Sequence, residues 1–179
     1  MADAAHAVPV DVDALLALDE AELERQCRFE AYKSGGPGGQ KRNKTSSAAR
    51  LTHGPSGVSA HSADFRSQAQ NRRRALHRLR FKLAGERRTP LDPRGYDPPA
   101  WLTAARRDGR FTTNTKNPEF ARIAAHALDV LEAVDARLSA AAALLGVPTS
   151  NLVHVLEAEP TVHAAAQRIR QKYGVVWRR

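Results

Sequence analysis

One short loop, SGGPGGQKRNKT at positions 34–45, holds the residues best suited to chemistry. Four glycines and one proline lie within its first six residues, followed by Gln40 and by three cations around Asn43. Glycines let a backbone approach a ligand closely, at an entropic cost that a simple connector has no reason to bear. Consecutive N–H groups can stabilise a developing oxyanion without carrying charge. The loop therefore predicts backbone-based chemistry beside a polyanion; the alternative is a flexible connector.

Two common phosphate-binding loops do not fit this pattern. A P-loop needs glycine followed by Lys-Ser/Thr and a helix, whereas Gly39 is followed by Gln40, Lys41 and a predicted strand. A Rossmann fingerprint needs a βαβ unit, which the pattern lacks. No nucleophile, metal cluster or paired general base adjoins the loop in the sequence, so we expect no cofactor and no metal.

The net charge of +9 is spread unevenly along the 179 residues. Residues 1–32 hold eight acids against two arginines, residues 33–88 hold fourteen Lys/Arg against two acids, and residues 89–179 are nearly balanced. A basic block of this kind favours a polyanion partner, RNA or DNA before a membrane; the alternative is a solvated charged face. No apolar run approaches the roughly 20 residues that span a bilayer, and no secretory signal is evident. We therefore expect a cytoplasmic protein.

The elements around the loop predict a small sheet with one basic helix. Residues 24–33, 47–52 and 57–61 read as strands, and HGPSG between the last two has hairpin chemistry. Ser67 is a natural N-cap for a helix that Gly85 should end. The side chains expected to pack on the sheet are Leu76, Leu79 and Leu83.

The second half of the chain predicts helices. Four prolines in residues 86–100 indicate an extended linker. Asn117-Pro118 should begin one long helix, because apolar residues recur at spacings of three and four from Phe120 to Leu145. Shorter helices are expected near 150–158 and 160–173. The stretch ALLGVPTSNLVHVL resembles a helix-turn-helix core; the alternative is an ordinary helical hairpin.

The predicted fold class is α+β: a small domain with an antiparallel sheet and one packed basic helix, followed by an all-α C-terminal domain. The predicted ranges are an acidic N-terminal segment (1–22), the sheet domain (23–85), the linker (86–100) and the helical domain (101–179).

Three stretches in order, SGGPGGQKRNKTSSAARLTH, GPSGV and ADFRSQAQNRRRALHRLR, carry a family resemblance. They resemble the GGQ domain of class-I peptide chain release factors and of codon-independent ribosome-rescue hydrolases, over about a third of the chain. In that family the GGQ motif enters the peptidyl transferase centre of the ribosome and promotes hydrolysis of the peptidyl-tRNA ester. The matching positions, implied as catalytic, are Gly38, Gly39 and Gln40.

The resemblance also implies how the loop would act. The Gln40 backbone N–H would stabilise the leaving 3′-oxygen, and its side chain would shape the space that admits water. Ribosomal RNA of the large subunit would form most of the active site, with peptidyl-tRNA as substrate. The residues expected to contact RNA are Lys41, Arg42, Asn43, Lys44, Thr45, Arg66, Gln68, Asn71, Arg72, Arg73 and Arg74; for any one arginine the alternative is a solvated side chain.

Only 33 residues precede Ser34, too few for a decoding domain, so we expect ribosome rescue without stop-codon recognition. The chain departs from the bacterial rescue hydrolases by ending in helices instead of a basic tail. Three alternatives stay open: a non-catalytic rRNA- or tRNA-binding quality-control factor, a nucleic-acid regulator using residues 96–179, and a terminator that borrows a separate decoding protein. The sequence also leaves open an unidentified partner of the C-terminal helices.

Overall fold

The computed structural model describes residues 11–33 and 47–175. By their contacts these residues form two compact units. Among the described residues, unit 1 combines Asp11 with Leu18–Lys82, and unit 2 combines Val12–Ala17 with the residues from Leu83 onward. The chain therefore contributes to unit 2 both before and after the main segment of unit 1.

The sheet of unit 1 has three antiparallel strands in the order β1-β2-β3: Cys27–Tyr32, Ala48–His53 and Ser59–Ser62. Its inward side chains include the fully buried Leu51 and Ala60, as alternation along half-buried strands requires. A turn at residues 53–58 joins β2 to β3, with Gly57 at a φ of 69° that favours glycine. The three predicted strands and the hairpin are confirmed, except that residues 24–26, predicted as the start of the first strand, belong to the end of a helix and its cap.

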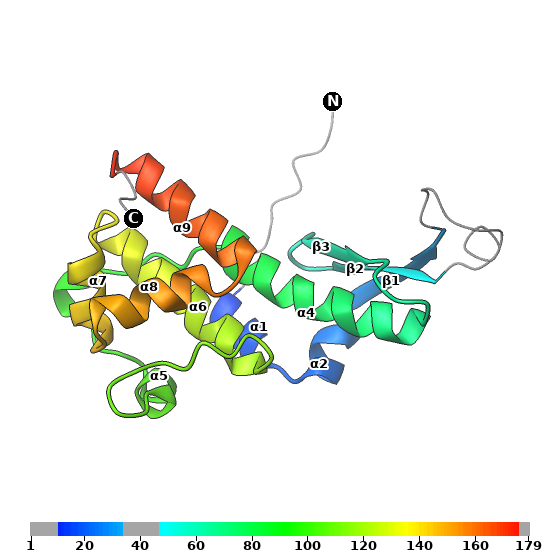
Figure 1. Ribbon diagram of the computed structural model, residues 1–179, viewed down its shortest axis with the longest axis horizontal. Coiled ribbons are helices and arrows are strands. Elements are labelled where there is room, and N and C mark those ends of the chain that lie inside the picture. Colours follow the sequence, from blue (N-terminus) through cyan, green and yellow to red (C-terminus); the bar gives the residue numbers. More distant parts are fainter. Residues whose placement is uncertain (1–10, 34–46, 176–179) are drawn as a thin grey trace. The chain divides into compact units, whose positions relative to one another are not determined.

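Helix α4 (Gln68–Glu86) lies along this sheet (Figure 1). Ser67 accepts hydrogen bonds from the backbone N–H groups of Gln70 and Asn71, as its predicted role as N-cap requires. Leu76 and Leu79 are buried, but by its contacts Leu83 belongs to unit 2. The helix ends at Glu86, one residue beyond the expected stop at Gly85. Helix α2 (Glu20–Arg25) completes unit 1 and begins with a capping box between Asp19 and Glu22.

Unit 2 is helical, with α6 (Pro118–Ala133) at its centre. Helices α1 (Val12–Ala17), α7 (Leu138–Leu145), α8 (Thr149–Glu157) and α9 (Pro160–Lys172) all contact α6. Figure 1 shows α6 to α9 gathered into one bundle. As predicted, Asn117 caps α6 by accepting the Glu119 N–H at 3.1 Å, and Pro118 occupies the first turn.

The prediction of one helix from 118 to 145 is wrong. The chain leaves the helical conformation at Asp135 and Ala136, whose φ angles are 56° and 61°. Aspartate tolerates the left-handed region and alanine rarely enters it, so tertiary packing imposes this turn. The apolar periodicity continues across the break because α6 and α7 both bury their stripes in the same core.

The proline-rich segment packs within unit 2. Its one short element is the 3₁₀ helix η1 (Pro93–Gly95), before α5 (Ala100–Ala105). The Tyr96 hydroxyl lies 2.8 Å from Nε2 of His126, and Arg88 pairs with the buried Asp129 at 2.7 Å. The predicted domain ranges stay a prediction; by contacts, residues 86–100 lie within unit 2.

Helix α1 is fixed to α6 by charge and packing. Arg122 donates two hydrogen bonds to Asp13, at 2.8 and 2.7 Å, and its guanidinium lies 3.8 Å from the ring centre of Trp101. Across the described ranges, no single helix is long and apolar enough to cross a membrane; α7 and α8, bent by 100°, reach that length and hydropathy only when counted together.

Candidate functional site

The predicted catalytic loop connects two neighbouring strands. β1 ends at Tyr32 and β2 begins at Ala48, and these two residues are paired in register. Lys33 and Ser47 are the described residues at the two ends of the loop. The residues predicted to be catalytic or to contact RNA within the loop lie outside the described ones and stay predictions: Gly38, Gly39, Gln40, Lys41, Arg42, Asn43, Lys44 and Thr45.

Asn71 is fully buried at the start of α4, so it does not make the direct RNA contact expected of it. Its Nδ2 donates to the carbonyls of Ser47 at 2.8 Å and Phe65 at 2.7 Å. Its Oδ1 accepts from the Phe65 N–H at 2.9 Å and the Ser62 hydroxyl at 3.1 Å. One amide therefore ties the end of the loop to the β3–α4 connection, and Asn71 is a positioning residue.

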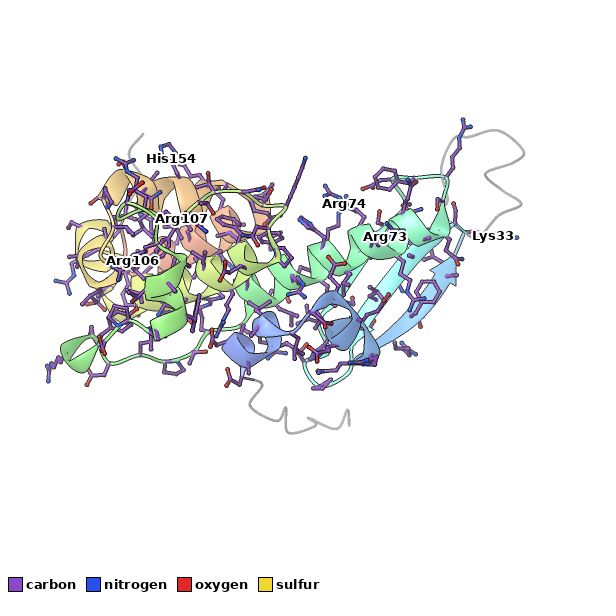
Figure 2. The ribbon with its side chains drawn as sticks, turned by 90° about the horizontal axis from the view of Figure 1, so that it is seen from below. Lys33, Arg73, Arg74, Arg106, Arg107 and His154 are labelled. Atoms are coloured by element: carbon purple, nitrogen blue, oxygen red, sulfur yellow. The ribbon has the colours of Figure 1, made fainter. Side chains whose placement is uncertain are left out.

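The other predicted RNA contacts in α4 and before it are exposed: Arg66, Gln68, Arg72, Arg73 and Arg74. Arg72 pairs with Glu24 and stacks 4.7 Å from the ring centre of Phe29, whereas Arg74 lies 3.7 Å from Asp64. Within the described ranges, no ion pair occupies Arg66 or Arg73. Figure 2 shows Arg73 and Arg74 on α4 and Lys33 at the end of β1. These guanidinium groups can bind phosphate oxygens without reading a sequence.

Three further cations of α4 support the fold. Arg78 donates to the carbonyl of His61 at 2.9 Å, and Lys82 donates to the carbonyl of Ser59 at 2.9 Å. Arg80 is buried and donates to the Leu18 carbonyl at 2.6 Å. Burial lowers the pKa of Arg80, and Glu20 and Asp19 oppose this shift. Nothing in the sequence distinguishes Arg80 from the other cations of α4, so its burial could not be predicted.

Cys27 and His53 lie at the end of β1 and β2 opposite to Tyr32 and Ala48. His53 is buried against Ser56 and Gln26, which lowers its pKa, and it pairs with Cys27 at the opposite end of β1 and β2. Five residues of strand put about 17 Å between this end and Ala48. Burial, with a smaller contribution from Glu24, raises the pKa of the Cys27 thiol to about 11, so at neutral pH it is protonated and not nucleophilic.

The described part of the chain contains no group of three His, Cys, Asp or Glu side chains placed to hold a metal ion. The expectation that no metal or cofactor takes part stays a prediction, since the loop lies outside that part. The described residues provide a sheet that pairs the two strands on either side of a glycine-rich connection, and a helix, α4, with exposed arginines.

Residues 18–94 match the model of the RF-1 domain family. The chain is also similar to curated proteins named peptide chain release factor 1. Those of Symbiobacterium thermophilum and Dictyoglomus turgidum are 42% and 43% identical over 82 and 81 residues, and that of Ehrlichia canis is 41% identical over 81 residues. Each match covers 44% of this chain and 22–23% of the relative, so the chain spans less than a quarter of their length.

No solved structure matches the chain. The sequence resemblance to the GGQ domain of release factors is confirmed by the family model and by these relatives.

Proposed function

From the RF-1 domain that residues 18–94 match, we propose that this protein acts on the ribosome and promotes hydrolysis of the peptidyl-tRNA ester. It releases the nascent peptide from stalled cytoplasmic ribosomes without recognising a stop codon. The observation that carries this proposal is the 41–43% identity to peptide chain release factors, together with an unbroken GGQ sequence at positions 38–40.

The chemistry we propose needs no side-chain nucleophile. Gly38 and Gly39 give the loop backbone the freedom to enter a narrow RNA cavity. The N–H of Gln40 donates to the leaving 3′-oxygen of the tRNA as negative charge develops there, and the Gln40 side chain leaves room for one water. That water attacks the ester carbonyl, the C–O bond to the 3′-oxygen breaks, and the proton lost by the water ends on that oxygen. Holding the water within reach of the carbonyl carbon supplies further rate acceleration.

The described frame supports this use of the loop. Asn71 fixes Ser47 at one end of the connection through a hydrogen bond of 2.8 Å, and pairing of Tyr32 with Ala48 holds the two strand ends together. Arg66 and Arg73 are free of ion pairs among the described residues, so phosphate oxygens can bind them without first breaking an internal pair. Loop insertion into RNA then begins from an ordered base.

The proposal that peptide release does not depend on a stop codon concerns the residues C-terminal to the matched region. The family match ends at residue 94, and the bundle of α6 to α9 lies beyond it. We propose that this bundle supplies a ribosome contact of its own, in place of contacts that depend on a stop codon.

The experiment measures release of labelled peptide from purified ribosome complexes stalled with, and without, a stop codon in the decoding site. We expect equal release from both complexes by the unaltered protein. Gly39→Ala restricts the backbone that presents the Gln40 N–H and should lower the release rate on the order of 100-fold, as loss of stabilisation at a developing oxyanion does. Gln40→Ala keeps that N–H and alters only the space for water, so it should lower the rate less. Co-sedimentation with ribosomes should change little.

Matched controls use residues outside the loop. Gly95→Ala introduces a Cβ into open space, and Thr89→Ala truncates an exposed side chain outside the loop and the bundle. Both should release peptide at the unaltered rate. If Gly39→Ala and Gln40→Ala release peptide as fast as these controls, the catalytic proposal is wrong and a binding function remains. Release that requires the stop codon would contradict the codon-independent part alone.

A further inference from the structure

A basic turn in unit 2 is not explained by the proposed catalysis. It comprises residues 106–111, RRDGRF, between α5 and α6. Arg107 and Arg110 are exposed, as is Lys116 shortly after the turn. Asp108 is the one acid among eleven residues that hold four cations.

The backbone of this turn places two arginines side by side. Arg107 and Arg110 exchange both backbone hydrogen bonds, at 2.9 and 3.0 Å, while Asp108 and Gly109 take positive φ angles. Residues directly opposite in such a pair project to the same face. Like charges in this arrangement repel, and no carboxylate in the described part of the chain forms an ion pair with either arginine. The fold therefore holds two uncompensated cations together.

The turn is anchored rigidly to α8. The buried side chain of Asn151 accepts the Phe111 N–H at 2.9 Å and donates to the Phe111 carbonyl at 3.0 Å. Phe111 itself is buried, which fixes the residue after Arg110. Both polar atoms of the amide are satisfied by one backbone residue, so the turn has a defined position relative to α8.

A second anchor joins the turn to the end of α7. Arg106 donates from Nη1 to the carbonyls of Leu145 at 3.2 Å and Gly146 at 3.4 Å. Gly146 has a φ of 64°, and a Cβ placed there would lie 1.9 Å from the same Nη1. The glycine therefore serves both the α7–α8 turn and the close approach of Arg106.

Helices α7 and α8 meet at 100° across a three-residue connection, as in helix-turn-helix motifs. Thr149 and Ser150 are exposed at the start of α8, and His154 is exposed one turn later. Glu157 is the last exposed residue on the same face of the helix. Figure 2 shows Arg106, Arg107 and His154 in unit 2. Hydroxyl, imidazole and guanidinium groups are the types that contact nucleic-acid backbones.

We propose that the basic turn and the exposed start of α8 form an RNA-binding surface for the phosphate backbone of double-helical RNA. This surface uses none of the residues proposed above for catalysis or for RNA contacts in the loop and α4. The preference for RNA over DNA rests on the proposed ribosomal function. The pair Arg107 and Arg110 supplies the main charge, and Thr149, Ser150 and His154 supply further hydrogen-bonding groups.

The test uses the full chain and a fluorescent 20-base-pair RNA duplex, with a DNA duplex of matching sequence as a second probe. Fluorescence anisotropy gives Kd from about 50 to 200 mM salt. The variant Arg107→Gln/Arg110→Gln should bind the RNA duplex about tenfold more weakly, with a salt dependence reduced by about two phosphate contacts. The control Arg25→Gln/Arg94→Gln removes equal charge from two exposed arginines outside the turn that, like Arg107 and Arg110, form no ion pair among the described residues.

The proposal is overturned if the two double variants bind the RNA duplex equally, or if loss of Arg107 and Arg110 weakens DNA binding more than RNA binding. Both variants change exposed side chains, and unaltered circular dichroism confirms that each is folded. No ribosome is present in this assay. Failure of peptide release therefore contradicts the proposed function alone, and equal binding contradicts the second RNA surface alone.

Discussion

Both units contain two kinds of cation, those paired with a carboxylate and those that are not. In unit 1, Arg66 and Arg73 are exposed and free of ion pairs among the described residues, whereas Arg72 and Arg74 each lie beside a carboxylate. In unit 2, Arg88, Arg122 and Lys172 are each paired with a carboxylate, at 2.7 Å in all three cases. Arg94 and the two arginines of the basic turn, in contrast, form no ion pair among the described residues of unit 2.

This difference shows why a count of charges does not locate a binding surface. A cation already paired with a carboxylate gains little from a phosphate, because the first pair must be broken. An unpaired cation keeps its full attraction for a polyanion. Substitutions can separate these two uses, with the largest effect expected where a buried pair is broken and the smallest where one neutral hydrogen bond is lost.

The largest loss of stability is expected from a substitution of Arg88. Arg88→Met leaves the buried Asp129 without its cation, and removal of one partner of a buried pair costs about 3–5 kcal/mol. Unit 2 should lose stability by this amount at pH 7. Urea unfolding followed by tryptophan fluorescence measures it, because both tryptophans follow Leu83 in the sequence.

Arg73→Met is the matched control in unit 1. It removes an exposed side chain without an ion pair among the described residues, so stability should hardly change. Equal destabilisation by the two variants would contradict the distinction between structural and available cations.

Asp129 should make the stability of unit 2 depend on pH. Burial raises its pKa to about 6, although Arg88 and the Thr89 N–H oppose the shift. Because the unfolded carboxyl titrates near 4, the folded state binds the proton more tightly between pH 4 and 6, and this contribution to stability falls as pH rises. The loss is on the order of 3 kcal/mol at most.

Asp129→Asn provides the comparison, since it cannot titrate. The stability of the unaltered protein minus that of the variant should decrease from pH 4 to pH 6 and stay constant above pH 7. Urea unfolding at each pH gives both values. An increase over this interval would show that pairing with Arg88 outweighs burial.

Within unit 1 the corresponding structural polar residue is Asn71. Asn71→Ala removes four hydrogen bonds and leaves the Ser47 and Phe65 groups unsatisfied, at a cost of about 2–3 kcal/mol. This destabilisation should be measurable as faster amide hydrogen exchange at Phe65 and along β2. Gln70→Ala, on the exposed side of the same turn, is the control and should leave exchange unchanged. Unchanged exchange in Asn71→Ala would mean that it does not order the end of the loop.

The smallest effect is expected at Tyr96. Tyr96→Phe removes the hydrogen bond to His126 and should destabilise unit 2 by about 1 kcal/mol. The measurement is again urea unfolding followed by tryptophan fluorescence. No change in stability would indicate that residues 86–100 behave as the linker predicted from their prolines.

Much of unit 1 could be predicted because its signals are local. Alternation along the strands, hairpin chemistry before Gly57 and the Ser67 cap each depend on a few neighbouring residues. The role of Asn71 could not be predicted in this way, since its partners Ser47, Ser62 and Phe65 come together only in the folded sheet.

Unit 2 was predicted less well for the same reason. The break at Asp135 and Ala136 interrupts a continuous apolar stripe, and no glycine marks it. The sequence also places α1 beside α2 in one acidic segment, whereas α1 packs on α6. Both features depend on packing between residues far apart in the sequence, and local sequence patterns do not reveal that packing.

The attachment of α1 to α6 has a consequence for synthesis of the chain. Val12–Ala17 is made about 100 residues before Pro118–Ala133, which at roughly 5–20 residues per second is a delay of about 5–20 s. During this time Val12, Leu15 and Leu16 have no α6 to cover them, whereas all of Leu18–Lys82 is completed before α6 begins. Final closure of the bundle therefore waits for nearly the whole polypeptide to be translated.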